Sequence, residues 1–444
     1  MRSLVLANLS LAGVALLSLS CAEPAAPFTG LPFIHDDFDA AVAEAKQKDV
    51  PIFVDAMAAW CHSCLSMQQY VFTDPKLAPV VDDYVWLELD MEKPENAGFR
   101  EKFPVEAFPT YFILDPRDEK ALIRWIGGCS VERVLTLLDE ATLAYNGEAP
   151  ERLAQADALY AAGNNEEAIT AYQDVFDTAD PGAPYYARTV ESLLFALSRT
   201  GDHERGLALA EETLPLLRQE MCAGNVVSYG LDFAIGLAED DPERQRRIDD
   251  METQAQAIAN DTTLGLVPDD RSGIYIALLA AREAAGDDEG HKRVAAQWAG
   301  FLNDAAAAAK TPAERVVFDS HRLSAYLELG EPQKAVPLLE QSERDFPDDY
   351  NPPARLAAAY RSMEAWDLGI AASERALSKP GTTGPRRLRI LGTLAELHKG
   401  KGDSGAARRT LADAVRHGEA LPQGQRSESL VNSLRNKLEA LGPA

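Results

Sequence analysis

Cysteine is scarce in this chain, with five occurrences among 444 residues. Small secreted folds that depend on disulfides need a far higher density, so this scarcity excludes a disulfide scaffold. Positive charge is also in deficit, because 43 Lys and Arg stand against 70 Asp and Glu and give a formal net charge of −27. Nucleic-acid binding requires clustered cations. The composition therefore argues against a nucleic-acid partner and favours neutral or basic partners.

The negative charge is unevenly distributed. Residues 34–145 contain 10 Lys and Arg against 21 Asp and Glu, whereas residues 386–444 contain 11 against 6. A basic segment of this size is most often a solvated surface, and a patch for an acidic ligand is the rarer alternative. We interpret residues 386–444 as a solvated basic end of the chain.

Long apolar runs are missing beyond residues 4–19, since no other stretch reaches the ~18 apolar residues of a spanning helix. That run predicts a signal peptide over residues 1–21 and a linker over 22–33. Residues 18–21 resemble a bacterial lipobox ending at Cys21, although Ser and Leu stand in unusual order. Ordinary cleavage after Ala22 and an uncleaved anchor are the alternatives. We expect an exported, periplasmic protein that meets the membrane only through a lipid on Cys21.

Two of the five cysteines, Cys61 and Cys64, lie where the apolar residues 51–59 give way to helix-compatible residues 65–71. Thiols three positions apart can close and reopen a small disulfide ring, and a helix N-terminus favours a thiolate on the first sulfur. We interpret the pair as a redox-active dithiol. The seven histidines are scattered and supply no further ligand at suitable spacing. We therefore expect no metal and no cofactor other than this disulfide.

The surrounding residues 34–145 alternate between strand and helix patterns. The predicted strands are 51–57, 84–91, 110–114 and 122–126, and the predicted helices are 38–48, 96–103 and 130–143. This order predicts an open α/β sheet with a parallel portion bridged by helices.

The motif from Val54 to Cys64, followed by Phe108-Pro109-Thr110, resembles the thioredoxin superfamily. Residues 71–77 resemble the C-terminal reductase domain of DsbD-type thiol:disulfide interchange proteins. The resemblance implies an exposed nucleophile at Cys61, a more buried resolving thiol at Cys64, and a cis peptide bond before Pro109.

The resemblance also places Asp55 beneath Cys64, where it shuttles that thiol's proton. A carboxylate in an apolar strand loses hydration, which raises its pKa, and an exposed strand-end position is the alternative. Trp60, His62, Phe108 and Thr110 are implied on the substrate side, with plain packing as the alternative for Trp60. His62 either stabilises the thiolate or faces solvent.

The remaining cysteines carry weaker signals. Cys129 follows two glycines after the last predicted strand, and is either an accessory thiol or inert. Cys222 lies near a predicted helix end, where we expect a packed structural residue.

Residues 153–444, after a linker at 146–152, lose all strand signals and show Ala- and Leu-rich helical patterns. Turn positions recur at Gly163, Gly201, Gly330, Glu364 and Gly402, close to the ~34-residue period of tetratricopeptide units, which these repeats resemble. A degenerate unit surrounds residue 286, residues 226–262 look irregular, and residues 427–441 form a capping helix. We expect five or six helical hairpins in an all-α solenoid.

Together these features predict an exported thiol-disulfide oxidoreductase, more specifically a reductase, whose repeats bind a peptide or protein partner. Its expected partners are protein disulfides or dithiols and a membrane thiol reductase as electron donor. The rival hypothesis is a non-catalytic periplasmic adaptor, in which the dithiol is vestigial or handles metal. Repeats that only dimerise or space the redox domain are a further alternative.

Overall fold

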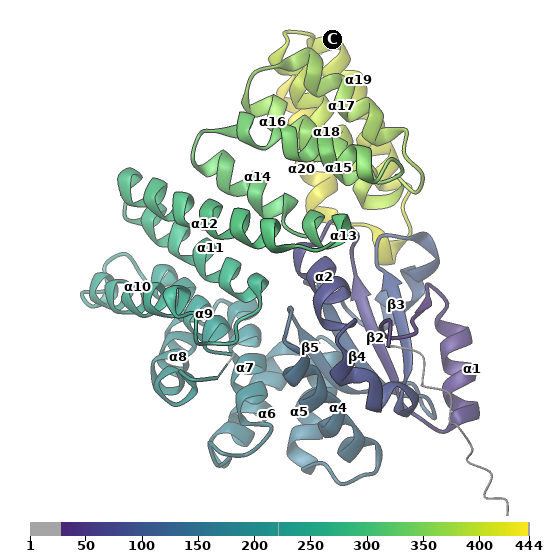
Figure 1. Cartoon of the computed structure of the whole chain (residues 1–444), viewed down its shortest axis with the longest axis vertical. Helices are drawn as coiled ribbons and strands as arrows, with labels where there is room; N and C mark the ends of the chain where they lie inside the picture. Colours follow the sequence, from purple (N-terminus) through teal and green to yellow (C-terminus); the bar gives the residue numbers. More distant parts are fainter. Residues whose placement is uncertain (1–27, 221, 443–444) are drawn as a thin grey trace, which may run out of the picture.

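The computed structural model describes residues 28–220 and 222–442. Its described N-terminal part contains a five-stranded sheet in the order β1-β3-β2-β4-β5 (Figure 1). Strand β3 pairs in parallel with β1 and β2, whereas β4 pairs antiparallel with both β2 and β5. The strands are β1 (Ile34–His35), β2 (Ile52–Met57), β3 (Val85–Asp90), β4 (Thr110–Asp115) and β5 (Lys120–Ile126). The predicted thioredoxin-type α/β sheet is therefore confirmed, whereas the two-residue β1 was not predicted.

Helices cover both faces of this sheet. Alternation along β2 sends Ile52 and Val54 to one face and Phe53 to the other. The Phe53 face packs against Met67 and Leu137, which belong to the helices after the dithiol and after β5. The helical elements are α1 (Phe38–Lys48), α2 (His62–Ser66), the π-helical turn η1 (Met67–Val71), the 3₁₀ helices η2 (Pro75–Asp83) and η3 (Pro94–Asn96), α3 (Ala97–Lys102) and α4 (Val131–Tyr145).

The rest of the described chain is the predicted tetratricopeptide-like all-α solenoid. It contains α5 (Glu151–Ala161), α6 (Asn165–Phe176), α7 (Tyr186–Thr200), α8 (His203–Leu217), α9 (Ala223–Gly236), α10 (Arg244–Asn260), α11 (Pro268–Ala284), α12 (Asp288–Ala308), α13 (Pro312–Val316), α14 (Asp319–Glu328), α15 (Val336–Asp345), α16 (Asn351–Ser362), α17 (Trp366–Leu377), α18 (Gly384–Gly400), α19 (Ser404–Glu419) and the capping helix α20 (Glu428–Ala440). No helix in the described ranges is long and apolar enough to cross a membrane.

The repeat pattern located the turns well and the number of units less well. Gly163, Gly201, Gly330, Glu364 and Gly402 all have positive φ, the conformation that ends one helix and starts the next. Seven helical hairpins occupy the described residues, rather than five or six. The expectation of an irregular segment at 226–262 was wrong, because α9 and α10 are regular helices. Their packing depends on small residues such as Gly230, which lies against Met251.

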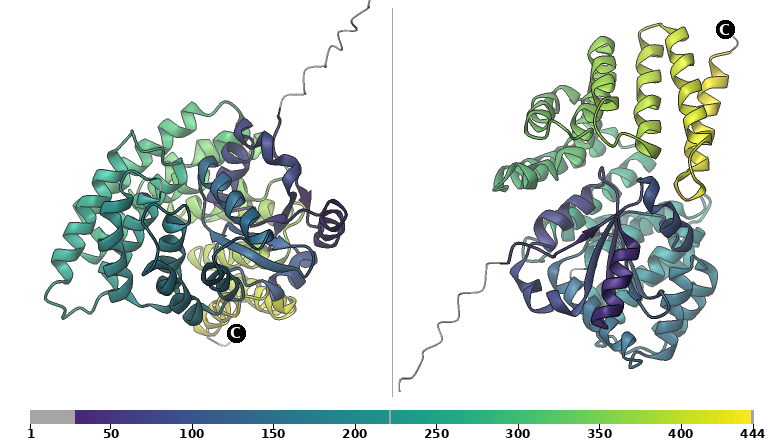
Figure 2. Two further views of the ribbon diagram at one scale, coloured as in Figure 1. Left: turned by 90° about the horizontal axis from the view of Figure 1, so that it is seen from below. Right: turned by 90° about the vertical axis from the view of Figure 1, so that its right-hand side faces the viewer.

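The solenoid curves around the end of the sheet at which the dithiol lies (Figures 1 and 2). It starts on the edge strand β5, where Arg124 is fully buried and donates to the Tyr160 carbonyl of α5 at 2.6 Å. It ends on α3, where the 3₁₀ helix η5 (Gln423–Gln425) places the Gly424 N–H 3.2 Å from Glu101. The middle helices therefore pass over the end of the sheet that carries the dithiol.

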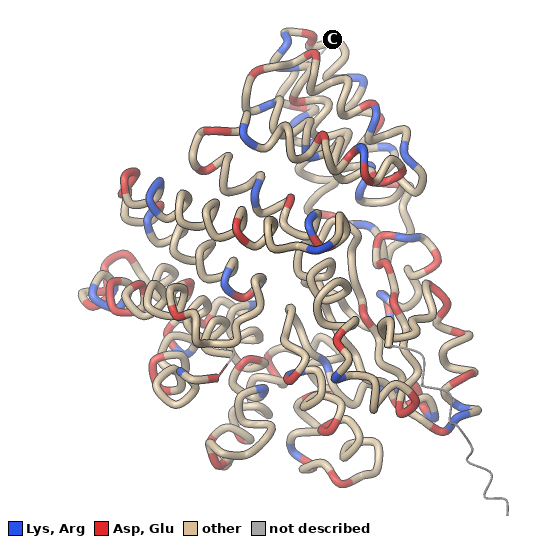
Figure 3. Tube along the Cα trace, in the orientation of Figure 1, with Lys and Arg blue, Asp and Glu red and all other residues tan. Residues whose placement is uncertain are grey.

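Buried ion pairs fix the first repeats to the thioredoxin-like part. Arg188 of α7 is 1% exposed and bonds to Glu140 of α4 at 2.5 Å and to Asp157 of α5 at 2.6 Å. A buried charge is tolerated only when it is paired in this way. Elsewhere basic and acidic residues are interspersed along the described chain (Figure 3).

Candidate active site

The dithiol lies at the start of α2. Cys61 and Cys64 form a disulfide with their Cα atoms 5.3 Å apart, and Cys61 occupies the N-cap position. The Cys64 N–H lies 3.1 Å from the Cys61 Sγ. After reduction this N–H would donate to a Cys61 thiolate, and hydrogen bonds to the charged form stabilise it. The local geometry therefore supports a reactive first sulfur.

Cys61 is less accessible than the sequence predicts. Its residue exposure is 4%, that of Cys64 is 0%, and that of the intervening His62 is 5%. The expected order, with the resolving thiol more buried, is observed, but the expected exposed nucleophile is wrong. Cys61 and Cys64 pack with Met57, Ala58 and Phe108 of the same part of the chain. His62 is covered by the solenoid, through Val317 and His321. We call residues 59–64 the dithiol rim.

Asp55 occupies the buried position that the resemblance implies. Strand alternation places it on the Phe53 face, which η1 and α4 cover, and its exposure is 0%. Neither carboxylate oxygen has a hydrogen-bond partner among the described residues. Burial raises the pKa of Asp55 well above its usual range, and the charge of Glu88 adds to this effect. The exposed alternative is wrong. Asp55 is a carboxyl that holds its proton at unusually high pH.

The loop before β4 lies beside the dithiol. The Phe108–Pro109 peptide bond is cis, as the resemblance implied, and the Phe108 ring contacts Trp60 edge-to-face at 5.8 Å. Within the described residues neither the N–H nor the C=O of Phe108 makes a hydrogen bond. Thr110 is fully buried and its hydroxyl donates to the Ala107 carbonyl at 2.7 Å. Thr110 therefore shapes the loop, and its contact with substrate stays a prediction.

His62 points into the solenoid and not into solvent. Its Nδ1 lies 2.5 Å from the Val317 carbonyl, which can only accept, so Nδ1 carries a proton. Its ring stacks on His321 of α14, with centroids 3.8 Å apart. Burial lowers the pKa of His321 well below its usual range, with His62 and Arg355 acting in the same direction. A neutral imidazole is thus held against the residue between the two cysteines.

A chain of hydrogen bonds fixes the His321 ring from behind. Trp298 Nε1 donates to Ser272 Oγ at 2.6 Å, and Ser272 Oγ lies 2.8 Å from His321 Nδ1. Both Trp298 and Ser272 are buried in the core of the solenoid. The helices α11, α12 and α14 therefore position the ring that stacks on His62.

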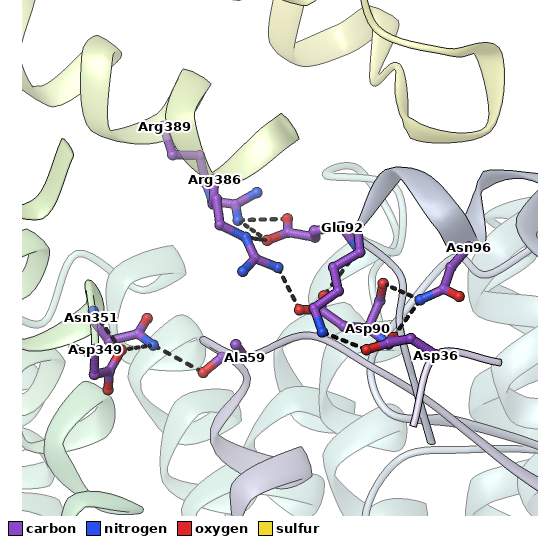
Figure 4. Close-up of polar contacts among 10 residues, drawn as sticks. Asp36, Ala59, Asp90, Glu92, Asn96, Asp349, Asn351, Arg386 and Arg389 are labelled. Carbon is purple, nitrogen blue, oxygen red and sulfur yellow. Dashed lines mark hydrogen bonds and ion pairs between the residues drawn. The ribbon is translucent and has the colours of Figure 1, made fainter. Parts of the chain in front are cut away.

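The backbone before Cys61 is bound by α16. Asn351 donates to the Ala59 carbonyl at 3.0 Å, and Asp349 accepts from the same amide at 2.9 Å (Figure 4). Arg355 reaches the Trp60 carbonyl at 3.4 Å. Trp60 itself remains 37% exposed. Trp60 is therefore partly available for docking, while the chain on both sides of it is held by the repeats.

Two arginines of α18 bind the loop after β3. Arg386 bonds to Asp90 at 2.6 Å, and Arg389 bonds to Glu92 through both carboxylate oxygens, at 2.5 and 2.7 Å (Figure 4). The Arg389 guanidinium also lies 5.0 Å from the centre of the Trp60 ring. The interpretation of residues 386–444 as a merely solvated basic end is wrong at these positions. Their charge pairs with the acidic excess of the thioredoxin-like part.

The other cysteines take no part in this arrangement. Cys129 is 4% exposed and Cys222 is 3% exposed, and burial raises the pKa of both thiols. Both are free and inert in this state, as expected for Cys222. In the part of the chain that the structure describes, no three His, Cys, Asp or Glu side chains gather as a metal site. Cys21 lies outside the described residues.

Sequence reasoning missed every solenoid residue that reaches the dithiol rim. These residues are His321 on α14, Asn351 and Arg355 on α16, and Arg389 on α18. In the sequence, His62 and Val317 are 255 residues apart, and Glu92 and Arg389 are 297 residues apart. Residues 34–145 have an excess of acidic side chains and residues 386–444 an excess of basic ones. This difference was a signal that could have indicated the contact of Arg389 with Glu92.

The comparisons agree with this geometry. Residues 34–116 match the family model described as Thioredoxin-like. The thiol:disulfide interchange protein DsbD 1 of Pseudomonas aeruginosa is 33% identical over 92 residues, which are 20% of this chain and 16% of that protein. DsbD of Salmonella typhi is 27% identical over 95 residues, 21% of this chain and 16% of its own length. The chain thus spans about a sixth of these curated relatives.

A tetratricopeptide repeat protein from Parabacteroides merdae resembles the solenoid loosely. It covers 66% of this chain and 98% of its own, with a TM-score of 0.40 and 9% identity. The description of the solenoid given above rests on its own helices and turns.

The raised pKa of Asp55 predicts how the stability of the protein changes with pH. The unfolded chain loses this proton at lower pH than the folded chain, so the contribution of Asp55 to stability falls as pH rises above the ordinary carboxyl range. We expect Asp55→Asn to raise the free energy of unfolding by about 1–3 kcal/mol at pH 8 and by little near pH 4. Denaturant titrations across pH measure this, with exposed Asp39→Asn as control. A variant destabilised equally at every pH would contradict it.

The lowered pKa of His321 predicts the opposite dependence of stability on pH. Its stability contribution is complete above the ordinary histidine value and is lost as pH falls, because the unfolded chain takes up the proton first. We expect the wild type to lose up to roughly 1.4 kcal/mol per pH unit below about 6.5 from this group. His321→Gln should flatten this loss in thermal scans between pH 5 and 8, whereas the control His398→Gln should leave it intact. Parallel pH profiles of wild type and His321→Gln would argue against a buried neutral imidazole.

Proposed function

We propose that this chain is a protein thiol-disulfide oxidoreductase that works as a reductase. The observation that carries the proposal is the joint placement of the Cys61–Cys64 pair, the buried carboxyl of Asp55 and the unbonded backbone of Phe108 before a cis proline. The match of residues 34–116 to the Thioredoxin-like model and the DsbD relatives support the same chemistry.

The reaction uses two electrons from the dithiol. The Cys61 thiolate attacks one sulfur of a substrate disulfide, so a Cys61–substrate bond forms and the other substrate sulfur leaves as a thiolate. Cys64 then loses its proton to the ionised form of Asp55, which the raised pKa makes a stronger base, and attacks the Cys61 sulfur. The second substrate thiol is released, and the Cys61–Cys64 disulfide re-forms. Substrate gains two electrons and the enzyme loses two.

Continued reduction needs a second dithiol that reduces Cys61–Cys64 again. The relatives named thiol:disulfide interchange protein are a model for such a donor, and we propose a membrane thiol reductase in this role. The Trp60 face is the docking surface in this proposal, because Trp60 is the exposed part of the rim, and the donor's dithiol reaches Cys61 on a protruding segment.

The covered rim favours one rival function. A Cys61 that is 4% exposed suits a domain that serves as a structural platform for the repeats, with a dithiol that no longer cycles. The two functions differ in one property: an oxidoreductase forms a mixed disulfide through Cys61, and an adaptor does not.

A resolving-cysteine variant separates these possibilities. We expect Cys64→Ser to accumulate mixed disulfides with partner proteins, which dithiothreitol releases, because the second attack is missing. Cys61→Ser should abolish disulfide reduction, at least 1000-fold, whereas buried Cys129→Ser should change the rate less than threefold. Non-reducing electrophoresis with mass spectrometry measures the adducts. A Cys61→Ser enzyme as fast as wild type would favour the adaptor.

We also propose that the protein is exported to the periplasm and attached to a membrane by a lipid on Cys21. The apolar residues 4–19 and the lipobox-like residues 18–21 support this. Expressed with its own leader, the wild type should fractionate with membranes and carry the mass of acyl chains. Cys21→Ser should move to the soluble fraction, and equal fractionation of the two proteins would refute the lipid anchor.

A further inference from the structure

Trp60, which precedes Cys61, and Phe108, which packs against both cysteines, each line a hollow that the solenoid completes. Hollow A, of about 280 Å³, is lined by Trp60, Leu323, Ala354, Arg355, Ala358 and Ile390. Hollow B, of about 220 Å³, is lined by Phe108, Gly127, Tyr160, Phe195, Asn225 and Tyr229. The edge-to-face contact of Trp60 with Phe108 joins their walls. Each hollow combines walls from the thioredoxin-like part with walls from the repeats.

The contacts made by the repeats prevent a flat protein surface from reaching the dithiol rim. The carbonyls of Ala59 and Trp60 are bound by α16, and His62 is bound by the segment from Val317 to His321. A folded partner surface would have to displace these contacts before it reached Cys61. An extended chain would not, because it occupies only the width of a strand, about 5 Å.

The size and chemistry of the hollows indicate what such a chain carries. Both volumes lie below the roughly 300 Å³ at which pockets for whole small ligands begin, so each suits one or two side chains. The walls of hollow A combine aliphatic and aromatic side chains with three arginines, and those of hollow B combine five aromatic side chains with the polar Glu191, Ser192 and Asn225. The unbonded N–H and C=O of Phe108 are available to pair with a strand that lies between them.

One arginine of hollow A makes no ion pair within the described residues. Arg386 and Arg389 are paired with Asp90 and Glu92, whereas Arg355 donates to the Trp60 carbonyl and acts on the carboxyl of Asp319 only through its charge. A carboxylate on the bound segment would complete the pairing of Arg355.

We propose that the substrate is an extended, unfolded segment of a partner polypeptide that lies across hollows A and B. Its cystine meets Cys61 between them, apolar side chains enter both hollows, and an acidic residue reaches Arg355. This inference rests on the proposed function and adds to it the conformation of the substrate. The solenoid is thus the part of the enzyme that selects unfolded cystine-containing chains.

A spacer series tests the conformation of the substrate without changing the enzyme. The substrate is one flexible 12-residue peptide with an internal cystine, used free or joined to a folded domain through 0, 5, 10 or 20 Gly/Ser residues. Its disulfide is chemically the same throughout. We expect the free peptide to react at least 100-fold faster than the zero-spacer fusion, and the 20-residue spacer to restore the rate. Rates that do not depend on spacer length would overturn the proposal.

Failure of the proposed function gives a different result. If dithiothreitol reduces Cys61–Cys64 but the reduced enzyme does not exchange even with the free peptide, the oxidoreductase function fails and this inference with it. If the free peptide reacts and the spacer has no effect, only the inference fails. Cys61→Ser, which must be inactive on every substrate, confirms that exchange passes through Cys61.

Two variants test the hollows themselves. Ala358→Trp fills hollow A and should slow the free peptide at least tenfold, whereas the matched Ala308→Trp on exposed α12 should change its rate less than threefold. A glutamate on the Trp60 side of the peptide cystine should give about a threefold to fivefold advantage over glutamine, and Arg355→Gln should remove it. A peptide rate unaffected by Ala358→Trp would show that the segment does not use hollow A. The spacer series remains decisive where a variant fails to fold.

Discussion

The contact of the solenoid with the dithiol rim is the constraint on which the rest of the structure depends. His62, which directly follows Cys61, is stacked on His321 and bonded to Val317, and the backbone before Cys61 is held by Asn351 and Arg355. His62 and Asn351 are buried polar groups, for which an unmade hydrogen bond costs about 1–3 kcal/mol. The rim and the repeats therefore form one structural unit.

This constraint changes the chemistry expected of a thioredoxin-like site. A thioredoxin-like domain alone would present Cys61 at an open edge, whereas here the same chain supplies both walls of the cleft. Burial lowers the pKa of the His321 imidazole, which stacks on His62, and raises the pKa of the Asp55 carboxyl. Both shifts favour the neutral form of the group. The repeats thus contribute to the polarity of the site.

Local patterns predicted the local structure. The apolar run before Cys61 gave β2, the Asp55 position followed from its place in that strand, and the glycine turns of the repeats were located at Gly163 and Gly402. What could not be predicted was the closure of the solenoid on the sheet. It depends on contacts such as Arg389 with Glu92, which join elements that no periodicity relates. The burial of His62 follows from that closure, whereas Cys61 is buried against Met57, Ala58 and Phe108, and the sequence predicted neither.

The most direct test of this closure is the proximity of two histidine rings from distant parts of the sequence. Because the chain has seven histidines, selective labelling of their ring carbons gives a resolvable set of signals. The centroids of His62 and His321 are 3.8 Å apart, so strong nuclear Overhauser effects between their ring protons are expected in solution. Clear ring signals for both residues without any cross-peak between them would contradict the account, since the dithiol rim would then be open.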